Sequence, residues 1–179
     1  MVTNDTRIAI LGGRGMLGTD LTGICEQRGF DVKVFDLPQF DVTNSRQLKE
    51  AVDAAQIIVN CAAFTDVDGA ESQSELAYQV NAEAVGRLGA LAKEANVWLL
   101  HVSTDFVFDG RLNRPYVEAD TPNPVNEYGK TKLAGELLLK QSGCRHCILR
   151  LEWTYGVAGN KSLPRGSGWP AVGRLVGVT

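Results

Sequence analysis

Residues 7–18, with the sequence RIAILGGRGMLG, decide the fold of this chain. The apolar run of residues 7–11 predicts a short β-strand, and the glycines directly after it predict a tight turn. Apolar residues then recur at helical spacing, which predicts a helix that ends at Gly29. A strand, a glycine turn and a helix in this order begin a βαβ unit.

The glycine spacing in this turn predicts a phosphate-binding site. Gly13, Gly15 and Gly18 fit G-x-G-x-x-G, and Gly12 begins the overlapping G-x-x-G-x-x-G spacing. Glycines let the backbone come close to a pyrophosphate, whose charge is attracted by the free N–H groups at the helix N-terminus. We therefore expect a dinucleotide cofactor at this turn.

Two residues bear on which dinucleotide binds. A second strand is predicted over residues 31–35, and Asp36 follows it, 18 residues after Gly18. An acid at this place accepts hydrogen bonds from the adenosine ribose hydroxyls and repels a 2′-phosphate, which favours NAD. Arg14 in the glycine turn favours NADP instead, because its guanidinium suits a 2′-phosphate. The sequence leaves both cofactors open.

Asp41 and Asn81 each allow two interpretations. Asp41 suits either the adenine amino group or the cap of a helix predicted from Ser45. Asn81 lies beside the apolar stripe of a helix that we predict after residues 66–75 and that ends at Asn96. It is either a buried residue hydrogen-bonded to backbone or an organiser of the cofactor site.

The remaining pattern predicts an α/β fold, a doubly wound parallel sheet of the Rossmann type. Apolar runs alternate with helical segments at the spacing of βαβ units. We expect five strands in the order 3-2-1-4-5, with no firm sixth. The predicted strands cover residues 7–11, 31–35, 56–60, 97–102 and 146–151.

Small and polar residues follow these strands at the sheet edge where such folds bind ligands. The small residues of segment 61–65 leave room for a flat ligand, and Thr104 is placed to hydrogen-bond a substrate carbonyl. Tyr128 and Lys132 are four residues apart on a predicted helix, so they share one face. A lysine cation beside the phenol lowers the tyrosine pKa, which suits a general acid that protonates a carbonyl oxygen.

Composition limits the function classes. The 179 residues are 44% hydrophobic and carry a net charge of -3, which predicts one domain and argues against nucleic-acid binding. We find no signal peptide or membrane-spanning run, so we expect no membrane association and a cytoplasmic location. Cys144 and Cys147 have the spacing of half a zinc site, but no second Cys/His pair completes it, so no metal is expected.

Read together, these motifs resemble the extended short-chain dehydrogenase/reductase family, and within it the dTDP-4-dehydrorhamnose reductase branch. The resemblance covers residues 7–160. It rests on the glycine turn, the pair at 41–42, and the segments at 61–65, 103–110 (STDFVFDG), 128–132 (YGKTK) and 150–156.

The resemblance implies that NADPH or NADH reduces the 4-keto group of dTDP-4-dehydro-L-rhamnose, a nucleotide-sugar, to give dTDP-L-rhamnose for cell-surface polysaccharide. It implies catalytic roles for Tyr128, Lys132 and Thr104, and substrate contacts for Thr104, Asp105 and Trp153. The expected cofactor-binding residues are Gly12, Gly15, Met16, Leu17, Gly18, Asp36, Asp41, Val42, Ala62, Ala63, Thr65, Tyr128 and Lys132. A homodimer is compatible with the resemblance. The alternatives are a non-catalytic dinucleotide-binding regulatory subunit, or an epimerase or dehydratase of the same superfamily.

The chain departs from the branch at three places. Met16 stands where the branch usually has Gln, and Glu152 replaces a small polar residue near the expected diphosphate. Beyond residue 160 the branch continues into a C-terminal substrate lobe, which we expect to be missing here. Residues 161–179 instead contain four glycines, two prolines and no acid. We therefore expect a Rossmann domain over residues 1–160 and an atypical, disordered tail over 161–179, which leaves the activity of the chain itself open.

Overall fold

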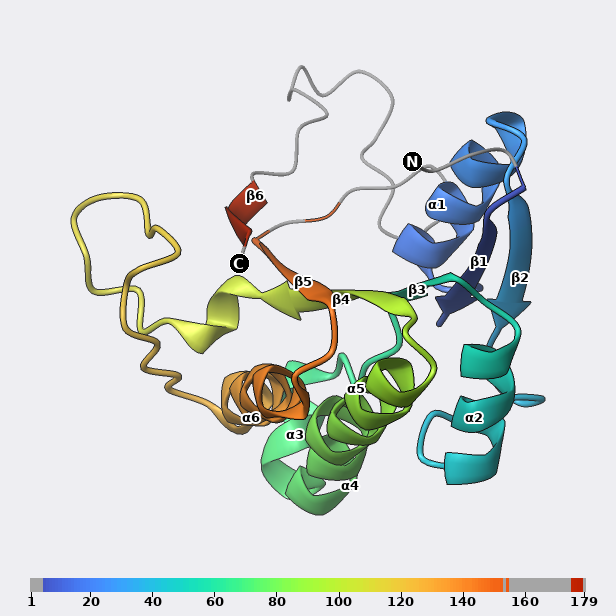
Figure 1. Cartoon of the computed structure of the whole chain (residues 1–179). Coiled ribbons are helices and arrows are strands. Elements are labelled where there is room, and N and C mark those ends of the chain that lie inside the picture. Colours follow the sequence, from blue (N-terminus) through green and yellow to red (C-terminus); the bar gives the residue numbers. More distant parts are fainter. Residues whose placement is uncertain (1–4, 153, 155–174, 179) are drawn as a thin grey trace, which may run out of the picture.

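The computed structural model describes residues 5–152, 154 and 175–178 of the chain. In this part of the chain, one six-stranded sheet has the strand order β2-β1-β3-β4-β5-β6 (Figure 1). The first five strands pair in parallel, and β6 pairs antiparallel with β5. The strands are β1 (Arg7–Leu11), β2 (Asp31–Phe35), β3 (Ile57–Asn60), β4 (Trp98–Thr104), β5 (His146–Leu151) and β6 (Leu175–Val178).

Helices cover both faces of the sheet, which confirms the doubly wound α/β fold. Helix α1 lies on one face, and α2, α5 and α6 lie on the other (Figure 1). The helices are α1 (Met16–Gln27), α2 (Ser45–Asp53), α3 (Val67–Ser72), α4 (Ser74–Tyr78), α5 (Ala84–Glu94) and α6 (Glu127–Ser142). A π-helical turn, η1 (Gln79–Glu83), joins α4 to α5, and a short 3-10 helix, η2 (Asp105–Val107), follows β4.

The predicted strand order 3-2-1-4-5 was wrong, because β3 pairs with β1 and β4 rather than with β2. Between β2 and β3 the chain has no further strand that could extend the sheet, only turns and α2. No residue of β2 is fully buried, as expected of an edge strand. The chain reverses its direction of travel across the sheet between β1 and β3, and this switch point is where open α/β sheets bind ligands.

The tail of the chain holds a strand that the sequence did not predict. Residues 175–178 form β6, which pairs with the end of β5. The expectation of a disordered tail was therefore wrong for these four residues. Residues 155–174 and 179 lie outside the described residues, and for them the expectation stays a prediction.

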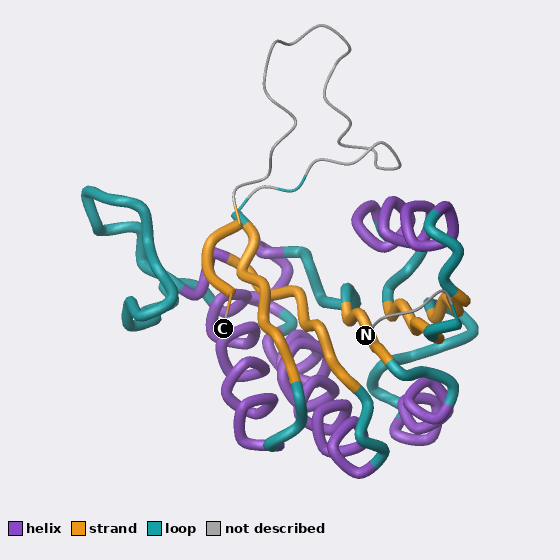
Figure 2. The backbone as a smooth tube through the Cα atoms, turned by 45° about the horizontal axis from the view of Figure 1, so that its top comes forward, coloured by secondary structure: helices purple, strands orange, loops and turns teal. Residues whose placement is uncertain are grey.

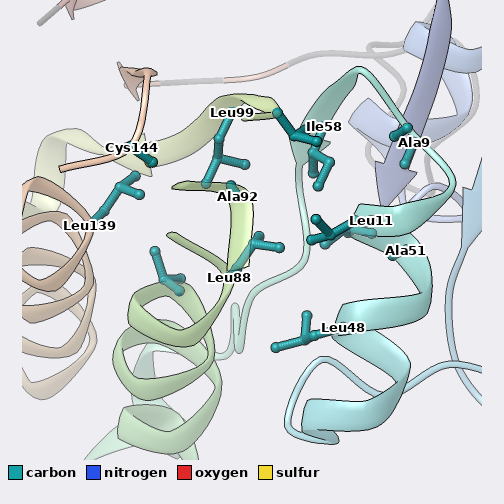
Figure 3. Close-up of a cluster of buried hydrophobic side chains, with 14 of the residues drawn as sticks. Ala9, Leu11, Leu48, Ala51, Ile58, Leu88, Ala92, Leu99, Leu139 and Cys144 are labelled. Atoms are coloured by element: carbon teal, nitrogen blue, oxygen red, sulfur yellow. The ribbon is translucent and has the colours of Figure 1, made fainter. Parts of the chain in front are cut away.

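The main core lies between the sheet and the helices α2, α5 and α6 (Figure 3). Leu11, Ile58 and Leu99 point from three neighbouring strands toward Leu48 of α2 and Leu88 of α5. All five side chains are at most 1% exposed. Burying each such side chain contributes about 1.5–3 kcal/mol to stability. This core holds α6 and the strand ends that carry the polar residues described below.

The helix predicted after residues 66–75 forms, but its middle is the π-helical turn η1, which carries Asn81. The Asn81 side chain donates to Phe64 O at 3.1 Å and to Thr131 Oγ1 at 3.1 Å, and it accepts from Phe64 N–H at 2.9 Å. Helix α6 packs closely here, since a Cβ at Gly135 would overlap the Asn81 carbonyl oxygen. Asn81 is thus a buried residue bonded to backbone, and through Phe64 it fixes the loop after β3.

Candidate functional site

Two adjoining cavities follow the carboxyl edge of the sheet at the β1/β3 switch point. Their volumes are about 460 Å³ and about 410 Å³. The two linings share Gly12 and Gly15 from the glycine turn and Cys61, Ala63 and Thr65 from the loop after β3. The cavities therefore form one continuous trough across the glycine turn. All thirteen expected cofactor-binding residues, and Thr104, line one or both of them.

The glycine turn is shaped for close approach of backbone to a ligand. Gly12 has φ +72°, and a Cβ there would stand 2.7 Å from Ala62 N. A Cβ at Gly18 would overlap the Gly12 carbonyl oxygen, so helix α1 starts directly against the turn. Gly15 caps α1 without a side-chain acceptor, and the first turn of α1 has no acid. The first N–H groups of α1 therefore suit the charge of a pyrophosphate, and the trough fits a dinucleotide.

The residues that bear on cofactor choice lie together at one end of the trough. The Asp36 carboxylate accepts from Arg14 N–H at 2.7 Å and from Leu37 N–H at 2.8 Å. The Arg14 guanidinium donates to Leu37 O at 3.1 Å and to Gln39 Oε1 at 2.8 Å. A carboxylate has about four lone-pair sites, so Asp36 retains acceptors for a ribose. With acid and guanidinium side by side, both dinucleotides remain compatible with this end of the trough.

Asp41 is not the cap of α2. Asn44 caps this helix and accepts from Arg46 N–H at 3.0 Å and Gln47 N–H at 3.3 Å. Asp41 lines the larger cavity, and its Oδ1 accepts from the backbone N–H and the hydroxyl of Thr43, both at 2.8 Å. The alternative, a contact with an adenine amino group, stays a prediction.

The second cavity brings Thr104, Tyr128 and Lys132 together. Lys132 is 2% exposed, and its Nζ donates to Val102 O at 2.7 Å. The Tyr128 side chain is half-buried and lines the same cavity as Thr104. Asn126 fixes the start of α6 by accepting from Gly129 N–H at 2.8 Å. A phenol, an ammonium and a hydroxyl thus meet in one cavity beside the glycine turn.

Burial dominates the acid–base properties of this group. Burial lowers the pKa of Lys132 to about 8, against the opposing effect of the Glu136 carboxylate. Burial also raises the pKa of Tyr128, while the hydrogen bond with Thr104 opposes this and Asp105 adds to it. The expected lowering of the Tyr128 pKa by Lys132 was therefore wrong for the chain as it stands. The physical reason is that desolvation of the phenol outweighs the effects that favour phenolate.

The Lys132 pKa predicts a pH-dependent stability. Between about pH 8 and pH 10.5 the unfolded chain binds a proton at Lys132 that the folded chain does not bind. This residue therefore makes the free energy of unfolding rise with pH. Relative to Lys132→Met, the wild-type free energy of unfolding should increase between pH 8 and 9, with a limiting slope of about 1.4 kcal/mol per pH unit. Urea unfolding at several pH values measures the difference. A difference that does not change with pH would contradict the lowered pKa.

Asp105, expected to touch the substrate, faces a different cavity. It lines a third cavity of about 470 Å³, together with Glu152 and residues of the segment 109–126. This segment projects to one side of the sheet (Figure 2). Asp105 Oδ1 accepts from the Thr104 hydroxyl at 3.0 Å, so the two residues are in contact although their cavities differ. Trp153 lies outside the described residues, and its expected substrate contact is untested.

A buried ion pair behind the site was missed by the sequence analysis. Glu136 is 1% exposed and Arg150 is 5% exposed. Arg150 donates to Glu136 through Nε at 2.9 Å and through Nη2 at 2.6 Å, and Ser103 Oγ donates to Glu136 at 2.5 Å. The spacing contained a signal, because Glu136 follows Lys132 by four residues on the same helix.

Asn60 and His101 form a second buried polar pair that the sequence analysis missed. The Asn60 amide lies 3.2 Å from His101 Nδ1 and accepts from Ala62 N–H at 3.1 Å. Burial lowers the pKa of His101 well below its usual range, and Lys132 adds to this. The pair therefore supports the start of the loop after β3 with a neutral imidazole.

Comparison with known proteins gives the family. A family model described as the RmlD substrate binding domain matches residues 6–164, which is most of the chain. The chain belongs to the RmlD family. It is 39% identical over 159 residues to dTDP-4-dehydrorhamnose reductase of Escherichia coli (strain K12), which covers 86% of this chain and 53% of that protein. The dTDP-4-dehydrorhamnose reductase of Aggregatibacter actinomycetemcomitans is 39% identical over 157 residues, which cover 86% of this chain and 53% of that protein.

A solved structure agrees with this RmlD-family assignment. The dTDP-4-dehydrorhamnose reductase of Bacillus anthracis str. Ames, in complex with NADP, superimposes with a TM-score of 0.83 at 35% identity. The match covers 87% of this chain and 56% of that structure. The chain thus spans about half the length of the relatives that it matches. Among its described residues, none of the helices combines the length and apolarity needed to cross a bilayer.

Proposed function

We propose that this RmlD-family chain binds NADPH or NADH and carries the residues that reduce the 4-keto group of dTDP-4-dehydro-L-rhamnose. The observation that supports the proposal best is the shared cavity of Thr104, Tyr128 and Lys132 beside the glycine turn. The names of the relatives, and the NADP bound by one of them, support the substrate and the cofactor.

Thr104, Tyr128 and Lys132 each have a separate role in the proposed carbonyl reduction. A reduced nicotinamide supplies a hydride when it is bound. In our proposal the Thr104 hydroxyl, which donates to Asp105 in this structure, turns to donate to the keto oxygen and orients it toward Tyr128. Tyr128 donates the proton to that oxygen, and its raised pKa means that it holds this proton near neutral pH. The Lys132 side chain, held by Val102 O, lines the same cavity and would hold the nicotinamide ribose; in the chain as it stands it does not lower the Tyr128 pKa.

The alternative of a non-catalytic regulatory subunit is disfavoured by this geometry, since a binding module has no need of a proton donor at the cofactor cavity. We place the reaction in the cytoplasm, because all four cysteines are free thiols, which suits a reducing compartment. The proposal leaves a homodimer possible. It gives Asp105 and Trp153 the substrate contacts that the resemblance implies.

Titration of the purified chain with NADPH or NADH, followed by nicotinamide fluorescence, tests the cofactor part of the proposal. Gly18→Ala should weaken binding by at least about tenfold, because its Cβ overlaps the glycine turn that cradles the pyrophosphate. Gly23→Ala is the matched control on the same helix, since a Cβ there meets nothing within 4 Å. Equal weakening by both variants, or no saturable binding by the wild type, would contradict a dinucleotide site at this turn.

The reductase part of the proposal is tested by measuring turnover. NADPH absorbance should fall when dTDP-4-dehydro-L-rhamnose is added to the chain. If cofactor binds without turnover, the chain supplies the cofactor site alone, and the reductase proposal fails for this chain.

A further inference from the structure

Ser103 lies between the two strand residues that hold the proposed catalytic pair. Lys132 donates to the carbonyl of Val102, directly before Ser103, and the phenol of Tyr128 lines the same cavity as Thr104, directly after it, whose hydroxyl acts on the Tyr128 pKa. The end of β4 therefore contacts α6 on both sides of Ser103. Any shift of α6 along β4 changes both contacts together.

The Ser103 hydroxyl donates to Glu136, which lies on the same face of α6 as Tyr128 and Lys132. Residues 128, 132 and 136 are spaced by four, so they form one line along the helix. Glu136 accepts from Ser103 Oγ and is held from the other side by Arg150 of β5. The Arg150 guanidinium lies 5.0 Å from the centroid of the Phe108 ring. One carboxylate thus links α6, β4 and β5 directly behind the second cavity.

We propose that Glu136 is a positioning residue, which fixes α6 against the end of β4 through Ser103 and Arg150 so that Tyr128 and Lys132 face the keto-sugar correctly. This inference rests on the proposed reductase function. A surface pair cannot act in this way, because long exposed side chains keep their freedom, whereas Glu136 and Arg150 are both nearly inaccessible. Glu136 itself touches neither substrate nor cofactor in this assignment.

Ser103→Ala is the variant that tests the link, because it removes one hydroxyl and no charge. We expect kcat to fall about three- to tenfold, with KM and the NADPH dissociation constant within about twofold of wild type, since small misplacements affect the reacting geometry most. Ser142→Ala is the control, because it also removes a hydroxyl, at the far end of α6, where it donates to Leu139 O. The control should leave kcat unchanged.

A second variant removes both charges of the Glu136–Arg150 ion pair together, so that neither is left without its partner. The double replacement Glu136→Leu with Arg150→Met keeps similar volume, and apolar replacement of buried ion pairs is generally tolerated by the fold. We expect kcat to fall at least about tenfold while circular dichroism and NADPH binding stay close to wild type. A folded double variant with full kcat would overturn the proposal.

A third measurement does not depend on turnover. The ionisable groups that face Lys132 among the described residues are Tyr128 and Glu136 on α6, Cys61 after β3 and His101 on β4. Ser103→Ala keeps all of these groups but removes the hydroxyl that donates to Glu136, so a shift of about half a pH unit in the Lys132 titration, followed by ¹³Cε NMR, reports the loss of the Ser103–Glu136 link. If the wild type lacks turnover, the reductase proposal fails and this titration alone decides the positioning role. An unchanged titration, together with unchanged kcat where turnover exists, overturns it.

Discussion

Tyr128→Phe should reduce keto-sugar turnover by about 10²–10⁴-fold, because Tyr128 is the only tyrosine among the described residues that line the cavity beside the glycine turn. The ring remains, and with it the edge contact with the Phe106 ring at 5.6 Å between centroids. NADPH binding should therefore stay within about threefold of wild type, which is about 0.7 kcal/mol. Steady-state consumption of NADPH and a fluorescence titration measure the two quantities on the same preparation.

Tyr78→Phe is the matched control for this prediction. Tyr78 is 42% exposed on α4 and lines neither cavity of the trough, so the same loss of a hydroxyl should leave turnover unchanged. Unchanged turnover in Tyr128→Phe would show that another group donates the proton. Loss of NADPH binding together with turnover would instead give Tyr128 a binding role.

Most elements of the fold were predictable, because each depends on local pattern; β6 in the tail was not. The apolar runs at residues 7–11, 31–35 and 146–151 became β1, β2 and β5 with the same bounds. Strand order was not predictable in the same way, since the same five strands satisfy their patterns in either order. Pairing is decided by whether a strand exists to cover β2, and none of the described residues forms such a strand.

The trough was predictable for a related reason. Its residues follow strand ends or begin helices, and parallel strands bring all their carboxyl ends to one edge, so order along the chain implies proximity. The ionisation of Tyr128 was not predictable, because the spacing to Lys132 reveals their shared face but not how deeply both are buried. Burial decides the sign of the pKa change here.

Glu136 and Arg150 show more clearly what the sequence pattern could not predict. A Glu on a helix is usually a solvated residue, and an Arg near a strand end is usually exposed. Only the packing of α6 across β4 and β5 shows that both are buried and bonded to each other. Their pairing makes each of them sensitive to loss of the other.

Arg150→Met should therefore lower the free energy of unfolding by about 3–5 kcal/mol, because it leaves the Glu136 carboxylate buried with only Ser103 as a donor. Arg46→Met is the control: Arg46 pairs with Glu50 at 3.4 Å, but its side chain is 90% exposed, so the loss should be at most about 1 kcal/mol. Urea unfolding of the three proteins at one pH measures the difference.

Adding Glu136→Leu to Arg150→Met should recover part of this lost stability, since neither member of the ion pair then remains buried without the other. A single Arg150→Met variant that loses no more stability than Arg46→Met would mean that water reaches Glu136 in solution. The carboxylate would then be free to move, and it could not hold α6 against β4 as the buried geometry requires. Stability and positioning therefore depend on the same property of this pair, its isolation from solvent.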